Sequence, residues 1–102
     1  MRAIRYSQTF FEELAELLEQ GVGRFGIRVV AEKRNLVLTT IKNAIAQFPV
    51  RPVDPVLGVC CYHVRKTPFV VFYDFDATEL RVHLVIHASA DRTQVDLMKV
   101  VW

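Results

Sequence analysis

Residues 67–87 read TPFVVFYDFDATELRVHLVIH, and this stretch decides the class of fold. Two apolar runs with a period of two, 69–75 and 80–88, flank the short polar segment 76–78. Such runs on both sides of a short turn predict two antiparallel strands joined as a hairpin. The second half of the chain is therefore expected to contain a β-hairpin.

The second strand of this hairpin carries side chains of different character on its two faces, because successive side chains of a strand point in opposite directions. We expect the apolar set to face the core: Leu80, Val82, Leu84 and Ile86. We expect the set with ionisable groups to lie on the opposite face: Arg81, His83, Val85 and His87. The question is whether this polar face carries out chemistry or lies beneath a binding partner.

Two amphipathic helices are predicted ahead of the strands. Thr9 is the expected N-cap of the first helix, because a glutamate follows three residues later, as in a capping box. Gly21 and Gly23 are expected to end this helix and to allow a tight reversal of the chain. The second helix is expected over about residues 24–47, closed by Pro49.

A short strand over residues 2–6 and a further strand over residues 57–64 complete the predicted order, β-α-α-β-β-β. An antiparallel three-strand meander packs one face against the helical hairpin, and the N-terminal strand joins the same sheet. A C-terminal tail or short helix follows, for which Asp91 or Thr93 is the expected cap. The predicted fold class is α+β.

Composition and length favour a single globular domain over residues 1–102, with 52% hydrophobic residues and only four glycines and four prolines. No apolar run approaches the roughly 20 residues that span a membrane, and no secretory signal is evident. We expect a cytoplasmic protein without membrane contact. Cys60 and Cys61 are adjacent and point to opposite faces of a strand, so we expect two reduced thiols. No cysteine or histidine stands at a zinc-like spacing, so no metal or other cofactor is expected.

Charge is unevenly distributed, although the net charge is only +2. The segment 24–51 carries a single acidic residue and six basic ones: Arg24, Arg28, Lys33, Arg34, Lys42 and Arg51. Two interpretations remain open. The segment is either a solvated helix face or an electropositive stripe that steers an anionic partner.

The order of elements and the segment PFVVFYDFDATELRVHLVIHASADR resemble the RelE/ParE toxin superfamily, in particular its ParE branch. The resemblance covers the whole chain in element order and about residues 58–92 in residue pattern. It implies the toxin of a bacterial type II toxin–antitoxin system, of the kind called plasmid stabilisation toxins. It also implies neutralisation by a ParD-like antitoxin in a hetero-oligomer, with DNA gyrase as the possible target.

The alternative within the same superfamily is a RelE-like, ribosome-dependent endoribonuclease that cleaves mRNA. Its nuclease members are expected to carry an arginine in the strand that here spans 69–73, where every residue is apolar or aromatic, and a tyrosine near the C-terminus. If this chain were such an enzyme, His87 would be the base, and Arg81 and His83 would hold phosphate. We expect a binding protein rather than an enzyme and keep the nuclease as the alternative.

The candidate target-binding residues are Arg81, His83, His87 and Trp102. The candidate antitoxin-binding residues lie in the tail: Leu97, Met98 and Val101. Structural roles stay open for the same positions: His87 can bond to the following turn, Arg81 can pair with Glu79 or Asp74, and the tail can pack on the protein's own core.

Overall fold

The computed structural model describes residues 2–102. Two helices, α1 (Gln8–Phe25) and α2 (Ile27–Thr40), follow the short strand β1 (Ala3–Tyr6), and α2 continues as one π-helical turn, Ile41–Ile45. Three strands come next: β2 (Cys60–His63), β3 (Phe69–Phe75) and β4 (Glu79–His87). The 3-10 turns Arg92–Gln94 and Leu97–Lys99 complete the chain. The predicted α+β order of elements is confirmed.

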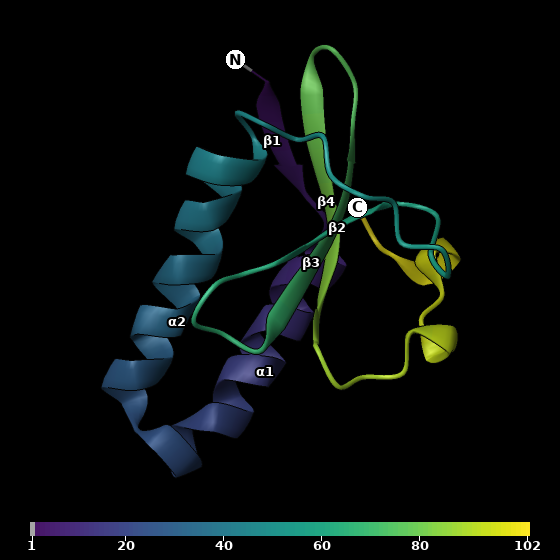
Figure 1. The fold of residues 1–102 in the computed structure, drawn as a ribbon. Coiled ribbons are helices and arrows are strands. Elements are labelled where there is room, and N and C mark those ends of the chain that lie inside the picture. The colour runs from purple at the N-terminus through teal and green to yellow at the C-terminus, as the bar shows by residue number, and fades with distance from the viewer. Residues whose placement is uncertain (1) are drawn as a thin grey trace.

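The four strands form one sheet in the order β1-β4-β3-β2. The pairs β2–β3 and β3–β4 are antiparallel, as predicted, and β1 runs parallel to β4 at the sheet edge. The two helices lie on one side of the sheet, and the C-terminal segment, drawn in yellow, lies on the other (Figure 1). The meander and helical hairpin are therefore present, and the tail adds a third layer.

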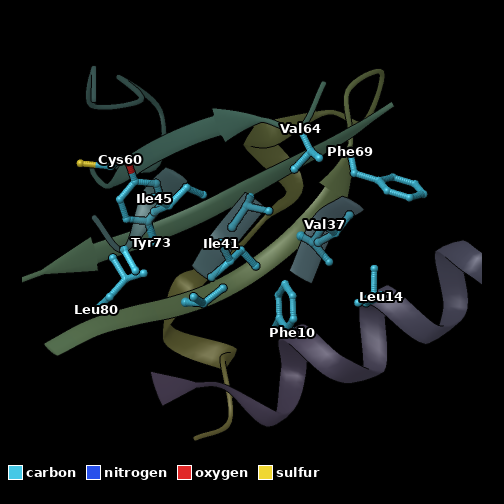
Figure 2. Close-up of a cluster of buried hydrophobic side chains, with 14 of the residues drawn as sticks. Phe10, Leu14, Val37, Ile41, Ile45, Cys60, Val64, Phe69, Tyr73 and Leu80 are labelled. Carbon is cyan, nitrogen blue, oxygen red and sulfur yellow. The ribbon is translucent and has the colours of Figure 1, made fainter. Parts of the chain in front are cut away.

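The main core lies between the helices and the sheet (Figure 2). Phe10 and Leu14 of α1 and Val37 of α2 meet Tyr73 and Leu80 of the sheet there, all of them buried. Burying a side chain of this size contributes about 1.5–3 kcal/mol. The Tyr73 hydroxyl donates to the carbonyl of Pro49 over 2.8 Å, so the one polar atom of that side chain is satisfied.

A second apolar cluster lies on the other side of the sheet. Its buried members come from β3 and β4: Val70, Phe72, Leu84 and Ile86. Val95, Leu97 and Val100 of the C-terminal segment pack against it. Both faces of the central strands are therefore covered.

The predicted division of β4 into an apolar and a polar face is wrong beyond Val82. Phe72 pairs with Leu84, whereas the next residue, Tyr73, pairs with Val82, so His83 is an extra residue in a β-bulge. One extra residue reverses the direction of every later side chain. Leu84 consequently faces the tail and Val85 faces the helices.

The helix boundaries also differ from those predicted. Ser7, not Thr9, is the N-cap, because its hydroxyl accepts a hydrogen bond from the amide of Phe10 over 2.8 Å. The helix continues through Gly21 and Gly23 and ends at Phe25, and its C-cap is Gly26, whose φ of +85° suits glycine. At Gly21 the helix runs close to α2, since a Cβ there would lie 3.3 Å from Cγ2 of Val30.

The second helix accordingly begins at Ile27 rather than at residue 24. Ile27 at the start of this helix and Phe48 beyond its π-helical turn are exposed. Strand β2 is shorter than the predicted 57–64, because the preceding residues wrap around Asp54, which accepts hydrogen bonds from the amides of Val56 and Leu57. The predicted strand 69–75 is confirmed at both ends.

Candidate functional site

Arg81 is held by three carboxylates at the turn between β3 and β4. Its Nε lies 2.5 Å from Asp74 Oδ1, and its Nη1 lies 2.8 Å from Asp76 Oδ2 and 3.0 Å from Glu79 Oε1. The hydrogen bond from Arg81 holds the pKa of Asp76 well below its usual range, and the same contacts raise the pKa of Arg81. The ion pairs expected with Glu79 or Asp74 both form, so the guanidinium is already neutralised.

His83 lies between a carboxylate and the only tryptophan of the chain. Its Nε2 is 2.9 Å from Asp74 Oδ2, so the carboxylate favours the proton on that nitrogen. Its ring meets the ring of Trp102 edge to face, with 4.9 Å between centroids, and the guanidinium of Arg5 lies 5.2 Å from the same indole. Within residues 2–102, Nδ1 of His83 is the one buried side-chain nitrogen or oxygen without a hydrogen-bond partner.

His87 lies on the other side of the sheet from His83, because the bulge reverses the strand between them. It is exposed, and its Nδ1 accepts a hydrogen bond from the amide of Ser89 over 3.1 Å, with the Ser89 hydroxyl at 2.7 Å. The histidine thus joins the strand to the following turn, the structural role left open above. The prediction that Arg81, His83 and His87 share one face is wrong.

The C-terminal segment is fastened at both ends. The carbonyl of Val101 accepts from the amides of Gln8 and Thr9 over 2.8 and 3.3 Å, and its amide donates to the Thr9 hydroxyl over 2.8 Å. At the other end, the guanidinium of Arg92 pairs with the carboxylate of Asp54. The tail packs on the protein's own sheet, and Asp91 caps its first turn by accepting from the amide of Thr93.

The buried carboxylate of Asp54 organises the loop before β2 as well as the tail. It accepts from the amide of Leu57 over 2.9 Å and from the amide of Val56 over 3.1 Å, besides its pair with Arg92. These bonds, that from Leu57 first, hold the pKa of Asp54 below its ordinary value. Its role is structural.

The three tail residues predicted to contact an antitoxin differ in accessibility. Leu97 is half-buried against the second apolar cluster. Met98 is 92% exposed and Val101 is 54% exposed. Only Met98 and Val101 present most of an apolar side chain to a partner.

A cleft of about 270 Å³, which the sequence did not reveal, opens between the end of the helical hairpin and the end of the β3–β4 hairpin. Its apolar lining includes Leu17, Leu18, Phe25, Val30 and Phe69. Its ionisable lining consists of Arg24, Lys33 and His87. Two members of the predicted electropositive stripe and one predicted site residue therefore meet at this cleft.

In the part of the chain that the structure describes, no group of three or more histidine, cysteine, aspartate or glutamate side chains is placed to hold a metal ion. Cys60 and Cys61 are free thiols, and burial raises the pKa of Cys61. None of the helices between residues 2 and 102 combines the length and apolar character of a membrane span.

Comparison with known proteins identifies the fold. No protein-family model matches the sequence, and the search of curated proteins gives no match. Among solved structures, a chain of "Chromosomal ParDE TA system from P. aeruginosa" superposes with a TM-score of 0.72 at 16% identity, covering 85% of this chain and 96% of that chain. At such identity the likeness concerns the fold, and this chain has the RelE/ParE-like fold that its order of elements predicted.

Proposed function

We propose that this chain is a ParE-like toxin of a type II toxin–antitoxin system, neutralised by a cognate ParD-like antitoxin with which it forms a hetero-oligomer in the cytoplasm. The observation that carries the proposal is the superposition on a chain of the ParDE system over nearly all of that chain's length. The residue pattern of β3, the turn and β4 also supports it, because this segment resembles the ParE branch.

The toxin acts by binding its target, with DNA gyrase as the proposed target. Geometry favours this over ribonuclease chemistry, because the proposed nuclease residues do not converge. Arg81 is occupied by three carboxylates, and His83 and His87 lie on opposite sides of the sheet. A base and its phosphate clamp need to reach one scissile phosphate together.

We place the target contact around Trp102, where a half-exposed indole lies between His83 and Arg5. Large aromatic side chains with a polar neighbour are typical anchors of protein interfaces. The antitoxin contact is proposed to include Met98 and Val101 on the outer surface of the tail.

Two assays on the purified protein test the target. Supercoiling by DNA gyrase should fall in the presence of the chain, and mRNA in a translating extract should stay intact. Arg81→Ala and His87→Ala should leave any growth inhibition in place, provided that the variants fold. Cleaved mRNA together with loss of toxicity in His87→Ala would establish the nuclease instead.

Membership in a toxin–antitoxin pair is tested by expression. The chain alone should arrest bacterial growth. Co-expression of a small neighbouring reading frame should relieve the arrest, and the protein that it encodes should co-purify with the chain as a complex. Normal growth under strong expression of soluble, folded protein contradicts the proposal.

A further inference from the structure

The cleft at the end of the helical hairpin is lined by apolar side chains together with two cations. The apolar ones include Leu17, Val30 and Phe69, and the cations are Arg24 and Lys33. No aspartate or glutamate is among the residues that line it. The site therefore suits a group that is apolar at its tip and negatively charged beside it.

His87 adds a hydrogen-bond donor to this lining. The backbone amide of Ser89 can only donate, so Nδ1 of His87 accepts in that contact. In the neutral ring the proton then resides on Nε2. A carboxylate at the cleft meets two cations and an N–H donor.

The size of the cleft and the surface around it favour a polypeptide over a small metabolite. The volume of about 270 Å³ lies just below the range of pockets for small ligands, which span about 300–1,000 Å³. The apolar surface continues outward over Phe25 and Ile27, which are 53% and 76% exposed. One large side chain fills the hollow, and the residues around it cover the exposed tip of the hairpin.

We propose that this cleft is the docking site for an acidic polypeptide segment of a partner protein, which inserts one large apolar side chain and places carboxylates against Arg24 and Lys33. The inference rests on the proposed function only in that a protein partner exists. It assigns that partner a second surface, on the opposite side of the sheet from the tail.

The inserted side chain lies over Gly21, where α1 and α2 approach each other closely. Lys33 is already directed toward the β2–β3 turn, because its Nζ donates to the carbonyl of Lys66 over 3.3 Å. The cation is therefore held near the cleft before the partner arrives, which lowers the entropic cost of binding.

The test uses the full chain and a capped, helix-forming peptide that presents one phenylalanine flanked by glutamates at a spacing of one helical turn. We expect saturable binding in a fluorescence anisotropy titration, and amide shifts at Gly21 and Phe69 in NMR spectra. Replacing the glutamates by glutamine, or the phenylalanine by alanine, should each weaken binding about tenfold.

Two matched double variants distinguish binding at the cleft from non-specific attraction to the positive charge of the protein. Arg24→Gln with Lys33→Gln should weaken binding about tenfold, whereas Arg34→Gln with Lys42→Gln, which removes two exposed cations outside the cleft, should change it less than twofold. Equal losses in the two double variants would overturn the assignment to the cleft. Equal affinity for the glutamate and glutamine peptides would overturn the charge complementarity.

Two further outcomes are decisive. Binding of free 3-phenylpropionate as tight as that of the peptide would show a small-molecule site and overturn the polypeptide occupant. Absence of peptide binding at millimolar concentration would overturn the docking site itself. Each of these results is independent of growth arrest, so failure here and failure of the proposed toxin function are distinguishable.

Discussion

Ser7 connects the start of α1 to the bulged part of β4 through its hydroxyl group and its backbone amide. The hydroxyl accepts from the amide of Phe10 at the start of α1 and donates to the carbonyl of His83 over 2.5 Å, while the Ser7 amide donates to the carbonyl of Val82. The carbonyl of His83 belongs to the bulged residue, so it depends on a partner outside the strand pair. One buried side chain thus caps the first helix and stabilises the bulge that orients Trp102's neighbour.

Replacing Ser7 by alanine should therefore cost more than the loss of an ordinary helix cap. A cap contributes about 1 kcal/mol, and leaving a buried carbonyl without its donor costs about 1–3 kcal/mol more. We expect the free energy of unfolding of Ser7→Ala to fall by about 2–4 kcal/mol in urea titrations followed by circular dichroism. Ser89→Ala, at an exposed position, is the control and should change it by less than about 0.5 kcal/mol. Equal losses would show that the bulge does not depend on Ser7.

Asp54 should make stability depend on pH in a defined direction. Its pKa is lowered in the folded protein from an ordinary value of 3.8, chiefly by the amide of Leu57 and also by Arg92. A group with a depressed folded pKa contributes stability above its unfolded pKa and loses it as the pH falls through the folded value. The stability difference between the natural chain and Asp54→Asn should be largest near neutral pH and should shrink below about pH 4. Urea midpoints measured from pH 7 to pH 3 test this, and a constant difference would contradict it.

The positions of the central strands could be predicted from the sequence, but the side of the sheet to which their side chains point could not. The apolar pattern of residues 69–75 predicts β3 with its observed bounds, because a buried strand leaves a strong pattern in the sequence. The bulge at His83 leaves no such pattern, since it depends on pairing between strands rather than on local sequence. For this reason the candidate site was predicted wrongly. The bulge places Arg81 and His83 on one face of the sheet and His87 on the other.

The helices show a similar competition between local and tertiary signals. Thr9 has the sequence spacing of a cap, yet Ser7 caps the helix and the Thr9 hydroxyl instead accepts from the amide of Val101. Gly21 has the residue type that commonly ends a helix, but the close approach of Val30 accounts for a glycine inside the helix. The cleft was missed because it is lined by residues from α1, α2, β3 and β4 that only the packed hairpins bring together.

The C-terminal segment should behave as a folded element rather than as a loose tail. Arg92 pairs with the buried Asp54, and its guanidinium carbon lies 5.4 Å from the ring centroid of Phe72, so it attaches the segment both to the loop before β2 and to β3. Removing one partner of a buried charge pair leaves the other unsatisfied. We expect Arg92→Ala to lower the free energy of unfolding by about 2–3 kcal/mol and to increase amide exchange at Val95 and Val100. Arg65→Ala, an exposed arginine in the β2–β3 turn, should leave both unchanged, and protected amides in Arg92→Ala would contradict this role.

Because both sides of the sheet are covered, the C-terminal segment has an inner surface that contributes to folding and an outer surface that a partner can contact. Leu97 packs against the second apolar cluster, whereas Met98, its neighbour, is 92% exposed. A carboxylate at position 97 would be half-buried against apolar groups, while the same carboxylate at position 98 remains in water. Leu97→Asp should therefore lower the thermal midpoint by about 10 °C or more, corresponding to about 2–3 kcal/mol, and Met98→Asp should leave it unchanged.

If the tail's outer surface contacts the antitoxin, Met98→Asp should weaken the complex about tenfold in a titration with the purified partner. Undiminished affinity in that folded variant would remove the tail from the interface and leave the cleft on the other side of the sheet as the surface to test.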